Sequence, residues 1–405
     1  MTSKKRLLIF AWEYNGYHSK QGTALARRIT QVAESFNANG WDVTVIHRDM
    51  REECGAQPFV VKTEQNGIRR IPVKLTGILE DYQQNPILRK IETLKYVALH
   101  GDRTYKWAKD VVNNYPQMGF TRPDLIIAFY TPRAPLFLGN YFSAKLGVQW
   151  IADIQDPVLA GISGFAKPWC RRWMSKTLST AKAIEHISPE WAATDADLLG
   201  LKFHTIRHAI PDTKPVPNPD FATRFRKEYE GYFTIFYGGS LTLRIQSLEL
   251  LKKMVAYGHA NNIRIKILLA ANDNVYQAFA GELGEDAVKH LGWLSPDEMN
   301  QYLLNIHCSL VVPWSAERVG IPSKFYELCN FGKPVWILGY DLGAFKTLLN
   351  EWQHPSIPFA DEAYQTQALK KAANGDYSLL FNLSTCKGKY LKAGDLYGEI
   401  VGLVG

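Results

Sequence analysis

Lys324 and Glu327 are the residues whose types and spacing point most directly to chemistry. They follow an apolar run, residues 308–312, that predicts a buried strand. Pro322 suits the first turn of a helix and Gly332 suits its far end. A helix that starts after a strand and a loop offers unpaired N–H groups to an anion. Lys324 and Glu327 are three residues apart, so they share one face of the helix. The ammonium of Lys324 can then reach phosphate oxygens, and the carboxylate of Glu327 can accept hydrogen bonds from ribose hydroxyls. An ordinary surface ion pair has the same spacing and is the commoner case.

A glycine turn provides a second candidate contact for phosphate. Gly238 and Gly239 follow the predicted strand 232–237, with Ser240 next and Arg244 just beyond. Backbone N–H groups of such a turn can approach a phosphate closely.

Strands and helices alternate along the chain, which predicts an α/β fold. A strand at 5–12, a helix at 23–39 and a strand at 42–47 form the unit that opens a doubly wound sheet. Further strands are predicted at 124–130, 148–154, 183–187, 232–237, 263–270, 287–291, 308–312 and 334–338, and a hairpin is predicted around Asn66-Gly67. The proline-rich stretch 211–218 predicts a stiff linker.

We therefore expect two Rossmann-like domains, residues 1–212 and 213–380, that face a central cleft. Residues 381–405 are expected to return to the first domain. The loop 13–22 lies at the carboxyl edge of the first predicted sheet, where ligands bind, but it lacks the GxGxxG pattern of dinucleotide sites.

Composition favours a soluble protein in a reducing compartment. The 405 residues are 46% hydrophobic and 21% charged, and no stretch approaches a membrane span or a signal peptide. The five cysteines are scattered, which argues against disulfides and a zinc site.

Residues 1–210 hold 28 Lys+Arg and 19 Asp+Glu, whereas residues 211–405 hold 19 and 20. The excess positive charge of the first half favours an anionic partner there, or serves solubility alone.

The stretch 165–176 interleaves aromatic and basic side chains. Trp169 and Trp173 alternate with Arg171 and Arg172. Such a mixture fits an anionic membrane interface, and we expect a cytoplasmic protein that could bind peripherally to the membrane face. The alternative is a helix that packs its tryptophans against the core and leaves its arginines in solvent, and the pattern favours this alternative over the membrane interface. RNA stacking is a third reading, but no recognition module accompanies it, so no nucleic-acid partner is expected.

Residues 320–335 (GIPSKFYELCNFGKPV) resemble the donor-site signature of the GT-B glycosyltransferases, specifically family 4, roughly G-x-P-x-K-x-x-E followed by G-x-P-V. The glycine loop after the first strand, Ile187-Ser188-Pro189 and Tyr237-Gly238-Gly239-Ser240 agree in the same order over nearly the whole chain. Three positions depart from the pattern: Val319 replaces a glutamate, with Glu317 as the nearest acid; Ser240 replaces an arginine; and 270–273 replaces a glycine-rich turn.

The resemblance implies a hexosyltransferase of polysaccharide biosynthesis that moves a sugar from a nucleotide sugar to a hydroxyl of a glycan or lipid-linked acceptor. It implies retention of configuration, no metal and no cofactor, with UDP or GDP as the expected nucleotide. The residues that it places at the donor are Gly22, Gly239, Ser240, Arg244, Trp293 (by the base), Gly320, Ile321, Pro322, Ser323, Lys324 (at the diphosphate) and Glu327 (at the ribose).

The resemblance also implies catalytic roles for Asp153, Lys324 and Arg244. Asp153 would lie near the reacting hydroxyl, and if the enzyme inverts, Asp153 or Asp156 is the best general base. The residues expected at the acceptor or the membrane are His18, Asp156, Trp169, Arg171, Arg172 and Trp173.

Two other functions remain open on the same architecture. A nucleotide-sugar epimerase or hydrolase would turn over the donor without an acceptor, and a non-catalytic scaffold would bind without turnover. The sequence Asp195-Ala196-Asp197 matches the DxD motif of metal-binding sites. On a predicted helix, however, carboxylates two residues apart diverge, so we expect both to be solvated.

Overall fold

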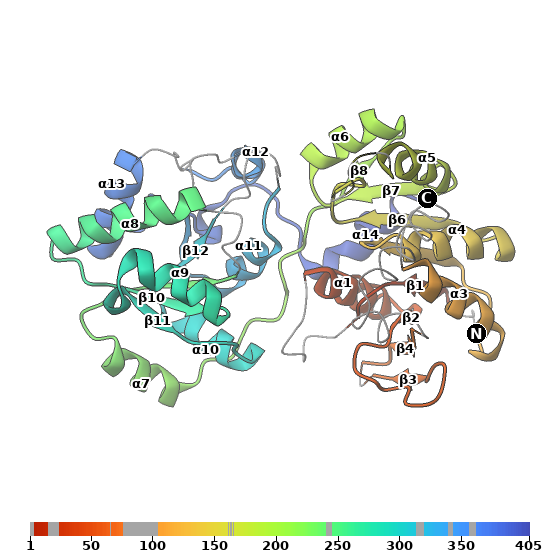
Figure 1. The fold of residues 1–405 in the computed structure, drawn as a ribbon, viewed down its shortest axis with the longest axis horizontal. Coiled ribbons are helices and arrows are strands. Elements are labelled where there is room, and N and C mark those ends of the chain that lie inside the picture. The colour runs from red at the N-terminus through yellow and green to blue at the C-terminus, as the bar shows by residue number, and fades with distance from the viewer. Residues whose placement is uncertain are drawn as a thin grey trace. The chain divides into compact units, whose positions relative to one another are not determined.

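A computed structural model describes residues 4–14, 24–64, 66–75, 104–160, 162, 164, 166–239, 245–312, 320–338, 343–355 and 362–405. Within these residues the chain forms two compact units (Figure 1). The first unit extends to His208 and includes Ala393–Gly405 from the far end of the chain, and the second unit is Ala209–Lys392. Each unit has its own sheet and its own hydrophobic core, as expected of separate domains.

The first unit is built around an eight-stranded sheet in the order β3-β4-β2-β1-β5-β6-β7-β8. Neighbouring strands are parallel except β3 and β4, which form the predicted antiparallel hairpin with Gly67 at φ 85°. The strands are β1 (Arg6–Phe10), β2 (Asp42–Arg48), β3 (Lys62–Thr63), β4 (Arg69–Val73), β5 (Leu125–Tyr130), β6 (Trp150–Ile154), β7 (Ala183–His186) and β8 (His204–Thr205). The carboxyl ends of the parallel strands therefore meet at one edge.

Helices cover both faces of this first sheet. On one face, neighbouring helices α3 (Tyr105–Asn114), α4 (Ala134–Leu146) and α5 (Ala166–Leu178) bury apolar side chains against the strands. Helices α1 (Ala24–Ala38) and α14 (Leu396–Val401) pack together, and α6 (Pro189–Leu199) follows β7. A Cβ on Gly139 of α4 would lie 2.7 Å from Trp150 Cε3, so glycine allows α4 to approach the sheet closely.

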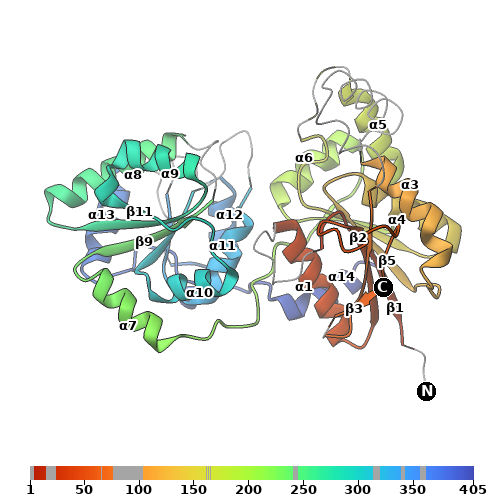
Figure 2. The same cartoon turned by 60° about the horizontal axis from the view of Figure 1, so that its bottom comes forward.

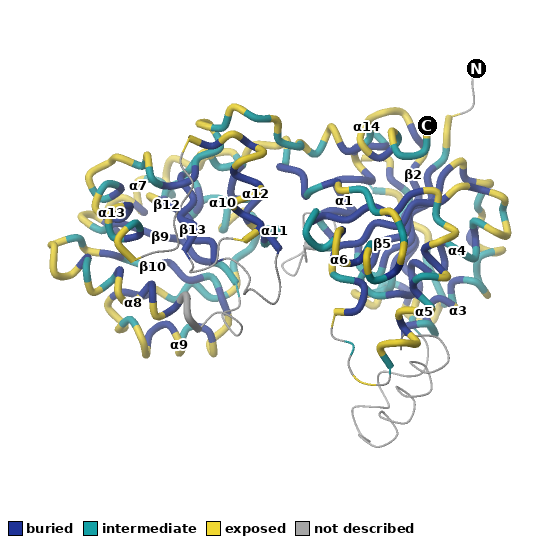
Figure 3. The backbone as a smooth tube through the Cα atoms, turned by 90° about the horizontal axis from the view of Figure 1, so that it is seen from above, coloured by how far each residue is buried: buried dark blue, intermediate teal, exposed yellow. Residues whose placement is uncertain are grey.

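The second unit has a five-stranded parallel sheet in the order β11-β10-β9-β12-β13. Its strands are β9 (Phe233–Gly238), β10 (Ile265–Ala270), β11 (Val288–His290), β12 (Cys308–Val311) and β13 (Val335–Ile337). Strands β9, β12 and β13 are nearly continuous apolar runs because helices cover both faces of the sheet, and Figure 3 shows them as buried, whereas the edge strand β11 has an exposed lysine.

Two apolar cores lie on either side of the second sheet. One core includes side chains of α8 (Ile245–Ala260), α9 (Asp273–Leu283) and α13 (Glu362–Ala373). The other includes side chains of α7 (Pro219–Glu228), α10 (Pro296–Asn305), α11 (Ser323–Leu328) and α12 (Gly343–Glu351). Figure 2 shows α8 and α9 on one side of the sheet and α7 and α10 on the other.

The segment that returns to the first unit is shorter than the expected 381–405. Phe381 is buried in the second unit, where its backbone pairs with Val335. The amide of Ile210 donates to the Leu391 carbonyl, which keeps residues up to Lys392 in that unit. The return therefore begins at Ala393, and the boundary between the units falls at 208/209 rather than 212/213.

Candidate functional site

Lys324 and Glu327 lie on a short helix, α11, that the core holds in place. Phe325 and Tyr326 are 0% and 2% exposed, and the Phe325 ring packs edge-on against Phe345 of α12 at 5.0 Å between centroids. Lys324 is exposed and Glu327 is half-buried. The two buried aromatic side chains thus leave Lys324 and Glu327 toward the outer side of the helix.

The ammonium of Lys324 contacts the glycine turn after β9. Its Nζ donates a 2.8 Å hydrogen bond to the carbonyl oxygen of Gly238, 86 residues away in sequence. A Cβ on Gly238 would lie 3.2 Å from Phe236 Cε1 and 3.4 Å from this Nζ, and Gly239 has φ 153°. Both positions therefore favour glycine. Two motifs that the sequence indicates separately as phosphate contacts meet at the carboxyl edge of the second sheet.

We call Gly238, Gly239, residues 320–323, Lys324 and Glu327 the Lys324 site. Its helix is shorter than the sequence pattern indicates, since α11 has six residues and continues as a 3-10 turn to Phe331. Pro322 is the N-cap and not part of the first turn. A helix this short has a small dipole, so the positive charge of the site comes chiefly from the Lys324 ammonium.

Trp293 follows β11 at the same edge of the sheet, beyond the carboxyl end of the strand. Its side chain is 75% exposed. An exposed indole offers a flat face on which a nucleobase can stack. In the next strand along the sheet, β10, the chain turns directly into α9, whose N-cap Asn272 accepts a hydrogen bond from the Val275 amide.

Four predicted ligand residues, Gly22, His18, Ser240 and Arg244, lie outside the described residues, so their roles stay predictions.

Asp153 lies in a buried ion-pair network in the first unit. Arg28 of α1 donates from Nε to Asp153 Oδ2 at 2.7 Å and from Nη2 to Glu185 Oε1 at 3.1 Å, and all three side chains are fully buried. Its Nη1 also donates to the Arg207 carbonyl at 3.0 Å. Because Asp153 is 0% exposed and paired with Arg28, it has no surface for a substrate, which argues against the expected position near the reacting hydroxyl and against the base role expected for an inverting enzyme.

The network contains two carboxyl groups and one guanidinium, so a proton must balance the second carboxyl group. Asp153 and Glu185 are register partners on β6 and β7. Burial, and then the neighbouring Asp153 carboxylate, raise the pKa of Glu185 well above its usual range. Asp153 Oδ1 and Glu185 Oε2 are buried without another donor among the described residues. Burial and the neighbouring carboxylate therefore favour the protonated form of Glu185 in the folded chain.

Sequence patterns contain signals for this network. Arg28 lies on the apolar stripe of its helix, three residues after Leu25 and four before Val32. Glu185 is a charged residue in the parallel strand β7, which is buried at all four positions. Charges at such positions are buried, and buried charges require partners.

Asp195 is also buried, which corrects the prediction that the DxD-like pair is solvated. It is 1% exposed, and its Oδ2 accepts from the Val158 amide at 3.0 Å. The same oxygen lies 3.5 Å from His186 Nε2. Asp197 is exposed, so the two carboxylates diverge as expected. Among the described residues, no three His, Cys, Asp or Glu side chains come together as a metal site.

Asp156 remains available at the carboxyl end of β6. It is exposed and accepts from Thr131 Oγ1 at 2.9 Å.

Helix α5 carries most of the basic and aromatic stretch and has both exposed and buried residues (Figure 3). Trp169 is 65% exposed, and Arg171 and Arg172 are exposed. Trp173 instead packs against the core, as the alternative reading expects, and contact of the exposed residues with a membrane stays a prediction. No helix in the described part of the chain is long and apolar enough to cross a membrane.

Comparisons with known proteins give a match in structure but not in sequence. No family model and no curated protein matches the chain. The catalytic domain of starch synthase IV from Arabidopsis thaliana, bound to ADP and acarbose, matches with TM-score 0.68 and 11% identity, covering 99% of each chain. Sucrose-phosphate synthase from Thermosynechococcus elongatus matches with TM-score 0.58 and 14% identity, covering 98% of each. HepE from Anabaena, in complex with UDP and glucose, matches with TM-score 0.51 and 11% identity, covering 98% of this chain and 99% of that one.

The chain therefore has the GT-B fold, with two Rossmann-like domains, as the sequence resemblance implies.

Proposed function

From this GT-B fold, we propose that the chain is a family 4-like glycosyltransferase that moves a hexose from a nucleotide sugar to a hydroxyl of a glycan or lipid-linked acceptor. The observation that carries the proposal is the 2.8 Å hydrogen bond from Lys324 Nζ to Gly238 O. It joins the lysine and the glycine turn, both candidate diphosphate ligands, at the sheet edge where doubly wound folds bind ligands. Two structural neighbours hold ADP or UDP, which supports a nucleotide as the ligand.

In the proposed complex, Lys324 and Arg244 neutralise the diphosphate and Glu327 accepts hydrogen bonds from the ribose. Trp293 stacks on the base, and UDP or GDP is the expected nucleotide. The bond between the anomeric carbon and the phosphate oxygen breaks while the bond to the acceptor oxygen forms. The acceptor proton passes to the departing phosphate oxygen, so retention needs no protein base. The charge that develops on the diphosphate is stabilised most by cations that are already in position.

Turnover of nucleotide sugars tests this proposal. UDP-glucose, UDP-N-acetylglucosamine and GDP-mannose are incubated with the protein, with and without a mixture of glycan and lipid-linked acceptors, and nucleotide release is measured by chromatography. We expect release of one nucleoside diphosphate that depends on an acceptor. Turnover without any acceptor would instead establish the epimerase or hydrolase, and binding without turnover would establish the scaffold.

We also propose that α5 places the enzyme on an anionic membrane surface. The exposed Trp169, Arg171 and Arg172 support this role, since each cation near such a surface contributes about 1 kcal/mol. The double variant Arg171→Glu/Arg172→Glu is expected to sediment with phosphatidylglycerol vesicles at least about tenfold less tightly than wild type. The matched control Lys289→Glu/Lys346→Glu reverses two exposed charges of the second unit. Equal sedimentation of the two double variants would exclude this membrane contact.

A further inference from the structure

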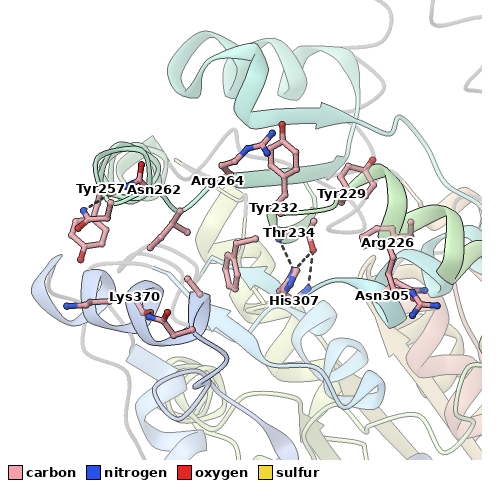
Figure 4. Close-up of a pocket in the computed structure, with 17 residues that line it drawn as sticks. Arg226, Tyr229, Tyr232, Thr234, Tyr257, Asn262, Arg264, Asn305, His307 and Lys370 are labelled. Atoms are coloured by element: carbon pink, nitrogen blue, oxygen red, sulfur yellow. Dashed lines mark hydrogen bonds between the residues drawn. The ribbon is translucent and has the colours of Figure 1, made fainter.

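A pocket, whose lining Figure 4 shows, opens in the second unit at the edge of the sheet opposite to the Lys324 site. Its volume is about 630 Å³, and its lining includes the first residues of β9 and the residues that precede β10 and β12. Because the strands are parallel, these amino ends lie at the edge away from Gly238. A volume of this size is typical of small-molecule sites. Nothing in the proposed transfer reaction uses this pocket.

The pocket is positively charged. Arg226, Arg264 and Lys370 line it, and no aspartate or glutamate is among its 17 lining residues. Arg226 and Lys370 lie in the last turns of α7 and α13, where a cation complements the helix dipole. Arg264 belongs to no helix and precedes β10. Stabilisation of helix ends therefore accounts for Arg226 and Lys370 but does not account for Arg264.

Arg264 is arranged as an anion receptor. Its guanidinium lies over the Tyr232 ring, 4.0 Å from the centroid. Its guanidinium makes no hydrogen bond to another residue within the described ranges. A stacked guanidinium keeps its N–H groups in one plane, where they can bind a carboxylate or phosphate through two hydrogen bonds. The ring fixes the orientation of the cation, and the hydrogen-bonding edge stays available.

His307 adds a neutral donor to the same pocket. Its Nδ1 lies 3.0 Å from the Thr234 amide, which can only donate, so Nδ1 is the acceptor and the ring proton lies on Nε2. Thr234 Oγ1 reinforces this tautomer at 2.8 Å (Figure 4). Burial, and then the nearby Lys333, lower the pKa of His307, which keeps the ring neutral.

The rest of the lining suits a polyhydroxylated ring. Half-buried Tyr232 and Tyr257, with buried Tyr229, give the lining aromatic surface, and Asn262 and Asn305 are among the side-chain amides (Figure 4). Helices α7, α8, α10 and α13 all end at this pocket. A simple inorganic anion would use the cations and would leave most of the volume of about 630 Å³ unfilled.

We infer that this pocket binds an anionic monosaccharide, with its phosphate or carboxylate on Arg264 and its sugar ring against the tyrosines. The inference stands on this pocket alone and does not depend on the proposed transferase activity.

Calorimetric titration of the full chain with glucose 6-phosphate, glucuronate, glucose and inorganic phosphate tests the inference. We expect at least one of the two anionic sugars to bind about tenfold or more tightly than both glucose and phosphate. Arg264→Met is expected to weaken that binding about ten- to hundredfold, because it removes two charge-assisted hydrogen bonds. Lys289→Met, which removes an exposed charge of β11 outside the pocket, is the matched control and is expected to bind like wild type.

Three results would overturn the inference. Phosphate that binds as tightly as both anionic sugars would indicate a nonspecific anion site. Undiminished binding by Arg264→Met, with melting temperature equal to wild type, would remove Arg264 as the receptor. Loss of sugar binding in Glu327→Ala, with retention in Arg264→Met, would place the sugar at the Lys324 site.

Discussion

Lys324→Ala is expected to weaken binding of the nucleoside diphosphate about ten- to hundredfold, since a hydrogen bond to a charged group contributes about 1.5–3 kcal/mol. The Gly238 carbonyl holds the Lys324 ammonium at 2.8 Å, so the cation is oriented before the ligand arrives. The turnover number is expected to fall further, about 100- to 1000-fold, because negative charge accumulates on the departing diphosphate in the transition state.

Calorimetry with UDP and GDP measures the loss of binding, and nucleotide release under saturating donor measures the loss of turnover. Lys346→Ala removes another exposed lysine of the same unit and is the matched control. Lys324 is exposed, so its removal is expected to leave the melting temperature unchanged. A Lys324→Ala protein that binds and releases nucleotide like the control would exclude the lysine from the diphosphate contact.

Arg28→Met is expected to destabilise the first unit by about 3–5 kcal/mol, because it leaves the Asp153 carboxylate buried without a cation. Three hydrogen bonds of the guanidinium are lost together: those to Asp153, Glu185 and the Arg207 carbonyl. Glu185→Gln is the matched control, since it keeps the shape of the side chain and replaces a carboxyl group whose protonated form is favoured by burial with a neutral amide. Its effect is expected to stay below about 1 kcal/mol.

The pH dependence of unfolding separates these roles further. The pKa of Glu185 is raised in the folded state, so the folded chain keeps a proton that the unfolded chain loses above its ordinary pKa of 4.5. Stability contributed by this group is complete below that pH and falls as pH rises toward the folded-state pKa, by up to about 1.4 kcal/mol per unit.

Urea titrations from pH 5 to pH 8 measure this effect. Wild type is expected to lose more stability across the range than Glu185→Gln. Equal slopes for the two proteins would mean that Glu185 is ionised in the folded state. An Arg28→Met protein as stable as Glu185→Gln would contradict the charge balance of the whole network.

The sequence predicts the alternation of strands and helices well because buried parallel strands are continuous apolar runs. The strand β5, LIIAFY, is buried at every position and is recognisable from its letters alone. The expected domain boundary at 212/213 is less accurate. The prolines of the linker indicate where the backbone is stiff, whereas the boundary between the units depends on which residues contact each unit. The bond from Ile210 to Leu391 joins residues 181 positions apart, which no local pattern reveals.

The Lys324 site is predictable in part for a similar reason. The motif around Lys324 and the glycine turn are local patterns, but their meeting depends on β9 and β12 being neighbours in the sheet. The position of Asp153 in the sequence is misleading, because the end of a strand is where a catalytic group is expected. In the fold it forms a buried ion pair with Arg28, which is 125 residues away in the sequence. The pocket around Arg264 has no sequence signature, because its lining is gathered from the ends of several elements.

A thermal-shift measurement with UDP, GDP, dTDP, ADP and CMP tests most directly whether the second unit binds a nucleotide through Lys324 and Glu327. Ligand at about 100 times its dissociation constant adds about 2.7 kcal/mol to the stability of the folded state. We predict a higher melting temperature with one nucleotide, UDP or GDP, and loss of that shift in Glu327→Ala. A folded wild-type protein that shifts with none of the five, or a Glu327→Ala protein that shifts as much as wild type, would contradict the account.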